Sequence, residues 1–289
     1  MQERALASGF FNSGAAFGAI VTPPLVVWIV LKAGWRAAFL TVGFTGFSWV
    51  LLWLIIYRTP REVQAETSAP PPRPWTLFRH RFVWSFTVAK IFLDPVWYFY
   101  VFWFPEYLKR GRHLDLASIG KFAWIPYLIA GLGNMIGGWL SGFPLRRGVP
   151  VTMARKSAVT VFVLLMTCSI AAVIVPRASV SIVLVSLAML GYTGVSANML
   201  AFRWMYTQRM VASIWGIAGM GSGSGGMLFV LITAWAVDHY SFGPVFVLFG
   251  SIPIVALLMV WFVVGPLQPV ALAADEKPAA DALNEIGRK

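Results

Sequence analysis

Two charged side chains interrupt an apolar and aromatic stretch, KIFLDPVWYFYVFWF at residues 90–104. Lys90 and Asp94 are four residues apart, so on a helix they share one face, one turn from each other. A Lys or Asp at the centre of a membrane helix costs roughly 2.5 to 3.5 kcal/mol, so the pair needs a reason. Lys90 could attract an anion, and a buried Asp94 could carry a proton. Mutual neutralisation is the alternative, although Lys before Asp is the weaker order for a helical pair.

Pro95 follows the pair directly. A proline inside a helix removes one backbone donor and clashes with the carbonyl four residues earlier, here that of Ile91. Backbone groups freed in this way are tolerated at membrane depth only against protein or a water-filled cavity. The sequence therefore predicts a helix break at Pro95 and a central cavity lined by Lys90 and Asp94.

Other polar or aromatic side chains within apolar segments are candidate substrate contacts. They are Trp97 and Tyr98, then Tyr192, Ser196 and Asn198 in GYTGVSANML (191–200), and Asn12 beside a glycine cluster. Packing or an interfacial belt is the alternative role for the aromatic residues, and hydrogen bonds between helices are the alternative for the others. Arg146 and Arg147, in the loop at 140–156, could latch conformational states as a cytoplasmic gate or could simply follow the charge topology of the chain.

The elements that must position these residues are membrane helices. Hydrophobic residues make up 58% of the chain, charged residues only 12%, and the mean hydropathy is +0.74. Continuous apolar runs, rather than alternating ones, favour an all-α integral membrane protein over a barrel. The sequence predicts about eight spans, at roughly 7–31, 36–57, 81–104, 117–142, 155–175, 179–202, 213–236 and 242–265.

The net charge of +12 is spread over the loops between spans, which disfavours a nucleic-acid-binding protein. Lys and Arg are more frequent in one set of alternate loops, so we expect both termini to be cytoplasmic. The three histidines, His80, His113 and His239, stand apart, and no catalytic or phosphate-binding motif is present. We expect neither an enzyme nor a metal or cofactor site.

Internal similarity indicates how the spans are grouped. Glycine clusters recur every third span, and GWRAAFLTVG (34–43) resembles GPVFVLFG (243–250), six spans later. Three-helix units nested in six-helix halves are typical of secondary transporters. The pattern predicts the last two helices of a first half at 1–57, a cytoplasmic linker at 58–79, a six-helix half at 80–265 and a cytoplasmic tail at 266–289. We expect a fragment lacking about four helices at its front; the alternative is a short carrier that pairs with itself or a partner.

Several motifs resemble the major facilitator superfamily, specifically the anion:cation symporter branch that includes hexuronate transporters. They are ERALASGFFNSGAAFGAIVTPPLV (3–26), GWRAAF (34–39), KIFLDPVWYFYVFWFPEYL (90–108), GGWLSGFPLRRG (137–148), SANML and GIAGMGSGSGGML. The resemblance implies a major facilitator fold, with this chain corresponding to helices 5 to 12 of twelve. Lys90 and Asp94 match the charged pair of the family's seventh helix.

The resemblance implies proton-coupled symport of an organic anion, such as a hexuronate or related sugar acid, by alternating access in a bacterial inner membrane. The expected partners are a small anionic substrate, the proton and the lipid bilayer. The chain departs from its relatives in two places. They read His-Gln-Gly-Trp-Ser-Ala-Asn where Tyr192 to Asn198 stand here, and Asp-x-Phe-Pro where Trp204 to Thr207 stand. Two alternatives stay open: a carrier of another carboxylate, such as an aromatic acid, and a non-transporting scaffold or accessory subunit.

Overall fold

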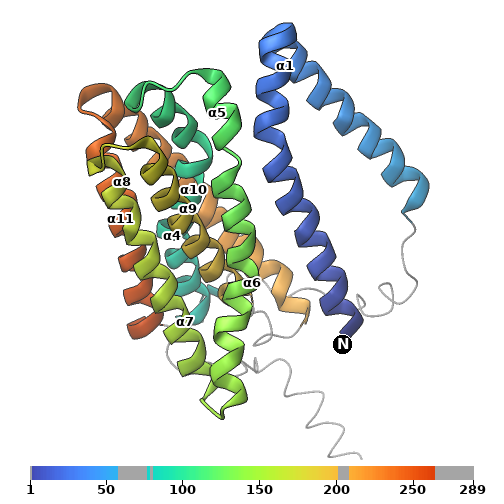
Figure 1. Ribbon diagram of the computed structural model, residues 1–289. Helices are drawn as coiled ribbons and strands as arrows, with labels where there is room; N and C mark the ends of the chain where they lie inside the picture. The colour runs from blue at the N-terminus through green and yellow to red at the C-terminus, as the bar shows by residue number, and fades with distance from the viewer. Residues whose placement is uncertain (1, 58–76, 79–80, 201–207, 264–289) are drawn as a thin grey trace, which may run out of the picture.

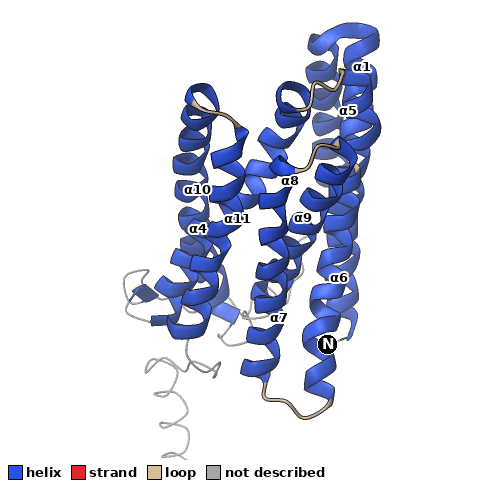
Figure 2. Ribbon diagram, turned by 60° about the vertical axis from the view of Figure 1, so that its left-hand side comes forward, coloured by secondary structure: helices blue, strands red, loops and turns tan. Residues whose placement is uncertain are grey.

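The computed structural model describes residues 2–57, 77–78, 81–200 and 208–263, with side chains at 17–57, 77–78, 83–199 and 212–263. These segments are helices and short turns, without a strand (Figures 1 and 2). Six of the described helices are long and apolar enough to cross a membrane. This confirms the predicted all-helical membrane fold. The expected linker, apart from Leu77 and Phe78, and the expected tail lie outside the described residues.

The N-terminal helix α1 (Gln2–Ile56) covers the first two predicted spans. Its two arms meet at Gly34, whose φ of 81° and ψ of 169° are not helical. Glycine adopts positive φ at little steric cost, so the chain can reverse here within one residue. Figure 1 shows the two arms leaving this bend at an angle. Phe17–Ile56 counts as a single candidate span, although the sequence predicts two spans there. This explains one of the two spans by which the six candidates fall short of the predicted eight.

The third predicted span is helix α4 (Arg81–Glu106), which is not among the six because Lys90, Asp94 and two prolines lower its hydropathy. The π-helical turn η1 (Tyr107–Gly111) extends it. The fourth and fifth spans follow. They are α5 (Leu116–Phe122) with α6 (Ile125–Arg146), and α7 (Val151–Met166) with η2 (Thr167–Ile170) and α8 (Ala171–Ile174).

The last three predicted spans are α9 (Ala178–Leu200), α10 (Gln208–His239) and α11 (Phe242–Leu258), which η4 (Met259–Val263) extends. Helices α4 to α11 pack into one bundle, and α1 lies beside it (Figure 1). The first arm of α1 touches the bundle through α5 and α6, whereas the second arm is exposed from Phe39 to Tyr57.

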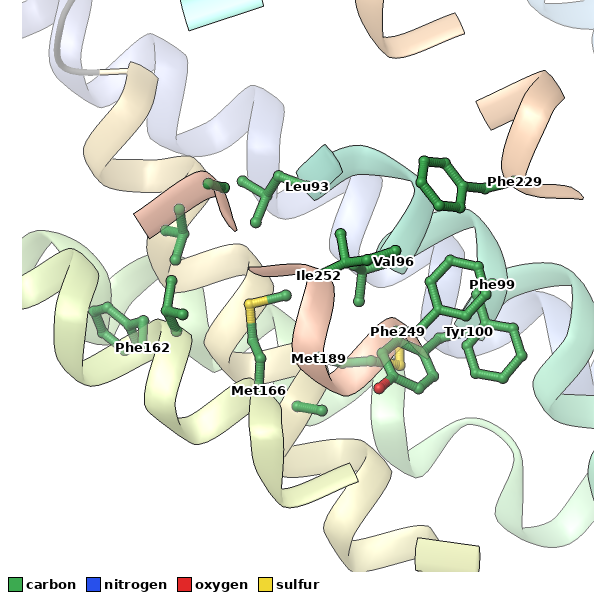
Figure 3. Close-up of a cluster of buried hydrophobic side chains, with 14 of the residues drawn as sticks. Leu93, Val96, Phe99, Tyr100, Phe162, Met166, Met189, Phe229, Phe249 and Ile252 are labelled. Atoms are coloured by element: carbon green, nitrogen blue, oxygen red, sulfur yellow. The ribbon is translucent and has the colours of Figure 1, made fainter. Parts of the chain in front are cut away.

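Aromatic and branched side chains form the core of the bundle, and the residues labelled in Figure 3 belong to α4, α7, α9, α10 and α11. Phe99 of α4 stacks on Phe249 of α11, with ring centroids 4.4 Å apart, and meets Phe246 edge to face. Met166 of α7 and Met189 of α9 are buried in the same cluster. This core fixes α4 against α11 and α9, and so fixes the frame that carries the charged pair.

Glycines set the closest helix approaches, as expected for membrane helices. A side chain at Gly137 of α6 would meet the backbone of Gly194 on α9, 2.8 Å away. A side chain at Gly221 of α10 would meet Thr87 of α4 at 2.6 Å. Part of each glycine cluster in the fourth and seventh predicted spans therefore serves helix packing, whereas a side chain at Gly18 of the first would meet open space.

Candidate anion site

The predicted charged pair forms an ion pair within α4. The Nζ atom of Lys90 lies 2.8 Å from Oδ2 of Asp94, and the two side chains are 14% and 6% exposed. The local sequence explains the geometry, because residues four apart on a helix are neighbours. Burial makes the pair costly unless further groups satisfy it.

Tyr192 of α9 supplies a further partner. Its hydroxyl donates a hydrogen bond of 3.1 Å to Oδ1 of Asp94. Both carboxylate oxygens are therefore occupied, one by a residue on the same helix and one from across the bundle. The sequence listed Tyr192 as a candidate contact but gave no link between it and Asp94.

Trp215 of α10 completes the surroundings of Lys90, with the Nζ atom 5.5 Å from the centre of its ring. Phe86 holds the indole by an edge-to-face contact at 5.5 Å. A cation over an aromatic face is stabilised more when it is shielded from water. Sequence reasoning missed Trp215, because its distance along the chain from Lys90 leaves no local pattern to connect them.

An aromatic group adjoins the pair. Trp97, almost one turn after Asp94 on α4, stacks on Tyr192 with centroids 5.2 Å apart and ring planes 22° from parallel. Tyr127 of α6 meets Trp97 nearly at right angles, at 6.5 Å. Tyr127 is a second residue that the sequence did not single out. The carboxylate, the ammonium and these rings thus gather from α4, α6, α9 and α10.

The remaining predicted substrate contacts on α4 and α9 have different surroundings. Tyr98 faces α10, where its hydroxyl lies 3.3 Å from Oγ of Ser222. Asn198 donates to the carbonyl oxygens of Gly137 and Gly194, which fits a hydrogen bond between α6 and α9, while its Oδ1 is buried with no hydrogen-bond partner. Ser196 is half-buried on α9, one turn beyond Tyr192.

Two other sets of residues were singled out from the sequence. The side chain of Asn12 and the segment Trp204 to Thr207 lie outside what the structure describes. Arg146 and Arg147 are exposed at the end of α6, and the guanidinium of Arg147 lies 4.2 Å from the centre of the Phe143 ring. Their gating role stays a prediction.

Helix α4 continues through Pro95 to Glu106. The carbonyl of Ile91, which loses its helical partner to Pro95, lies against Gly225 of α10, so tightly that a Cβ there would clash with it. Protein backbone therefore covers this group, one of the two surroundings that the sequence allowed. A bend at Pro95 and a cavity lined by the pair stay predictions. Within the described residues, no cluster of three or more His, Cys, Asp or Glu could hold a metal ion.

Comparison with known proteins identifies the family. The family model described as Major Facilitator Superfamily matches residues 1–205. The chain belongs to this superfamily. The superfamily consists of transporters, so the motif resemblance and the prediction that the chain is not an enzyme are both confirmed.

The chain is 28% identical to a hexuronate transporter of Escherichia coli (strain K12), covering 96% of this chain and 69% of the relative. It is 24% identical to a D-galactonate transporter of Escherichia coli (strain CFT073), covering 93% and 68%. A probable galactarate/D-glucarate transporter of Bacillus subtilis is 25% identical, over 97% and 68%. The chain is thus shorter than these bacterial relatives.

Among solved structures, the chain is similar to a bacterial homologue of the human lysosomal transporter Spinster in an inward-facing, unoccupied conformation. The TM-score is 0.48 and the identity 17%, over 90% of this chain and 62% of that one. The chain therefore spans less than two thirds of that structure.

Proposed function

We propose that this superfamily member takes part in secondary active transport of an organic anion, such as a hexuronate or related sugar acid, in symport with protons. The observation that carries the proposal is the buried pair of Lys90 and Asp94, joined by the hydroxyl of Tyr192. An intramembrane ion pair is costly and commonly marks a substrate or proton pathway. The names of the relatives, which transport hexuronates, galactonate and glucarate, support an acidic sugar as the substrate.

The charges of the pair provide a coupling mechanism. At rest, the ammonium of Lys90 is neutralised by Asp94. A proton that binds Asp94 releases Lys90, which then pairs with the carboxylate of the incoming anion. Tyr192 remains as the hydrogen-bond partner of the protonated Asp94. One proton and one substrate carboxylate enter together, so the net charge of the site and the number of buried charges are both unchanged.

Alternating access exposes this site to one side of a bacterial inner membrane and then to the other. The proposed arrangement places both termini in the cytoplasm and assigns α4 to η4 to a six-helix half of the transporter. The remaining contacts of the substrate come from Trp97 and the face of α9 that carries Ser196.

A binding titration tests the site. Purified chain in lipid nanodiscs is titrated with glucuronate, and the heat of binding is measured. Wild type should saturate, and Lys90→Ala should weaken binding at least about tenfold. Because Lys90→Ala leaves a buried carboxylate unpaired, the double variant Lys90→Ala/Asp94→Ala, which removes both charges, is measured as well. Lys121→Ala, an exposed lysine on α5, is the control.

Saturable binding that weakens at least about tenfold in both Lys90 variants and is unchanged in the control supports the proposal. Unchanged glucuronate binding by a folded Lys90→Ala/Asp94→Ala variant would falsify it. Absence of saturable binding in wild type favours a scaffold or accessory role instead.

The Trp97–Tyr192 stack favours a second candidate, a carrier of aromatic carboxylates. Rings prefer offset or edge-to-face contacts with such groups. Competition between glucuronate and benzoate separates the two. Displacement of glucuronate by a much lower concentration of benzoate assigns the site to aromatic acids.

A further inference from the structure

Arg112 directly follows η1, at the end of the bundle opposite the loops that are predicted to face the cytoplasm. Its guanidinium joins two helix ends. Its Nε donates to the hydroxyl of Tyr107 at 2.6 Å. Its terminal nitrogens donate to the carbonyl oxygens of Ala172 and Val175, each at 2.6 Å, and of Pro176 at 3.3 Å. A further bond of 2.7 Å reaches Oγ of Ser181 at the start of α9. We call Arg112, Tyr107 and Ser181 the clasp.

The clasp is buried except for part of Arg112. Tyr107 is 2% exposed and Ser181 is fully buried. Both hydroxyls also donate to the carbonyl of Ala172, at 2.9 and 2.7 Å. The last carbonyls of a helix lack partners within it, and a planar, permanently charged fork here binds the carbonyl of Ala172 in α8 and those of Val175 and Pro176 just beyond its end. The acceptors of Arg112 are all neutral oxygens, so salt should screen these bonds little.

The backbone around Arg112 is shaped for this contact. The N–H of Arg112 donates to the carbonyl of Tyr107, and that of Leu114 donates to the carbonyl of Leu108. His113 between them has a φ of 56°, the left-handed conformation that ends many helices but is uncommon outside glycine. The chain thus accepts an uncommon conformation at the residue that follows Arg112.

The clasp and the anion site both join α4, or its extension η1, to α9. The end of α4 meets the start of α9 at the clasp, and their middles meet where Tyr192 reaches Asp94, so the helices run antiparallel. Asp94 is about 20 Å from Tyr107 along α4, and Tyr192 is about 16 Å from Ser181 along α9, at 1.5 Å per residue. A fixed contact at the clasp therefore also fixes how α4 and α9 are aligned at the contact between Tyr192 and Asp94.

We propose that Arg112 is a positioning residue, which sets the register between α4 and α9 and so holds Tyr192 against Asp94. A slip of one residue moves one helix by about 1.5 Å. The hydrogen bond of 3.1 Å between Tyr192 and Asp94 would then stretch beyond bonding distance. The consequence for substrate binding rests on the proposed function, whereas the geometric role does not.

A double-mutant cycle tests the consequence. Arg112→Ala and Tyr192→Phe are made singly and together, and glucuronate binding is measured. Each single change should weaken binding about fivefold, the value of one hydrogen bond. If Arg112 acts through Tyr192, Arg112→Ala should have no further effect in the Tyr192→Phe background. Arg110→Ala, an exposed residue paired with Glu106 one turn away, is the matched control and should bind normally.

If Arg112→Ala acted only through a general loss of stability, it would weaken binding equally in the wild-type and Tyr192→Phe backgrounds. That result overturns the proposal. Normal binding by Arg112→Ala overturns it as well. If Arg112→Ala does not fold, Ser181→Ala is the milder variant for the same cycle, because it removes one hydroxyl group and no charge.

A second measurement needs no ligand. Cysteines replace Asp94 and Tyr192 in a chain with Cys168→Ala and Lys90→Ala, which keeps the site neutral. Bifunctional thiol reagents of graded length then report the separation of α4 and α9. The clasp predicts that Arg112→Ala changes the reagent length of highest yield, whereas Arg110→Ala does not. An unchanged optimum overturns the positioning role. If wild type does not bind glucuronate but the optimum shifts, the proposed function fails and the clasp stands.

Discussion

Asp94 receives both of its partners at fixed distances, Lys90 at 2.8 Å and Tyr192 at 3.1 Å. The two contacts differ in kind. The first is a charge pair that a substrate carboxylate can replace, and the second is a hydrogen bond that survives when Asp94 is protonated. In the proposed mechanism, this difference makes Asp94 the residue at which proton and substrate binding are coupled.

Asp94→Asn tests this coupling. Asn is close in size, keeps an acceptor for Tyr192 and carries no charge, so Lys90 is permanently available to an anion. We expect glucuronate to bind at least as tightly as in wild type, with an affinity that no longer changes between acidic and alkaline buffers. Titrations over a pH series measure the effect. A variant with the same pH dependence as wild type would place the coupling proton elsewhere.

The sequence predicted this centre only in part. Lys90 and Asp94 were predictable because their spacing is local and their burial is costly in lipid. Trp215 and Tyr127 were not, because a Trp or Tyr in an apolar span is ordinary, and only the packing of α10 and α6 brings these rings to α4. Tyr98 and Asn198 have partners on neighbouring helices, as many polar groups in a span do, and their contact with a substrate stays a prediction.

At the scale of helices, close contact between α4 and α10 depends on glycines, which have no side chain. Gly225 lies against the carbonyl of Ile91, and Gly226 lies against the ring of Tyr98. The helices therefore approach within backbone distance next to Pro95, where the hydrogen-bond ladder of α4 has lost a donor. The same approach carries Trp215 toward Lys90.

Gly225→Ala should separate these helices, because the new methyl group would overlap the Ile91 carbonyl. We expect a loss of about 1 to 3 kcal/mol in the free energy of unfolding, together with weaker anion binding. Gly223→Ala is the control, because a Cβ there meets nothing within 4 Å. Thermal unfolding followed by tryptophan fluorescence checks both variants. Equal unfolding temperatures would show that α10 can move without cost.

The predicted helices themselves were well placed by apolar run length, whereas their joints were not. The sequence separated the first two spans by a short connection, and the structure joins them as α1 with one non-helical residue, Gly34. Similarly, nothing in the sequence indicated that the end of α4 widens into the π-helical turn η1. Joints depend on single dihedral angles, which composition does not report.

For the whole molecule, each end of the bundle carries an exposed arginine. Arg147 lies exposed at the end of α6, beside the connection to α7 that Figure 1 shows at the bottom. Arg110 lies exposed in η1, shortly before α5 at the top of the same view. The excess of Lys and Arg predicts that the end with Arg147 faces the cytoplasm.

Cysteine labelling in intact bacterial cells tests this orientation. In a Cys168→Ala chain, Arg110→Cys and Arg147→Cys are exposed separately to a membrane-impermeant maleimide. After the outer membrane is opened, Arg110→Cys should be labelled at once, and Arg147→Cys only after the inner membrane is permeabilised. The reverse pattern would invert the proposed topology.

The ion pair also bears on how the chain enters the membrane while it is being made. Both charges belong to α4 and sit one turn apart, so they can neutralise each other as soon as that helix forms. Tyr192 is 98 residues further along than Asp94, which corresponds to a delay on the order of 5 to 20 s at ribosomal speed. During this interval α4 must reside in or beside the translocon without its partner from α9. The spacing of Lys90 and Asp94 thus lets the two charges of the nascent helix neutralise each other before α9, which carries Tyr192, has been synthesised.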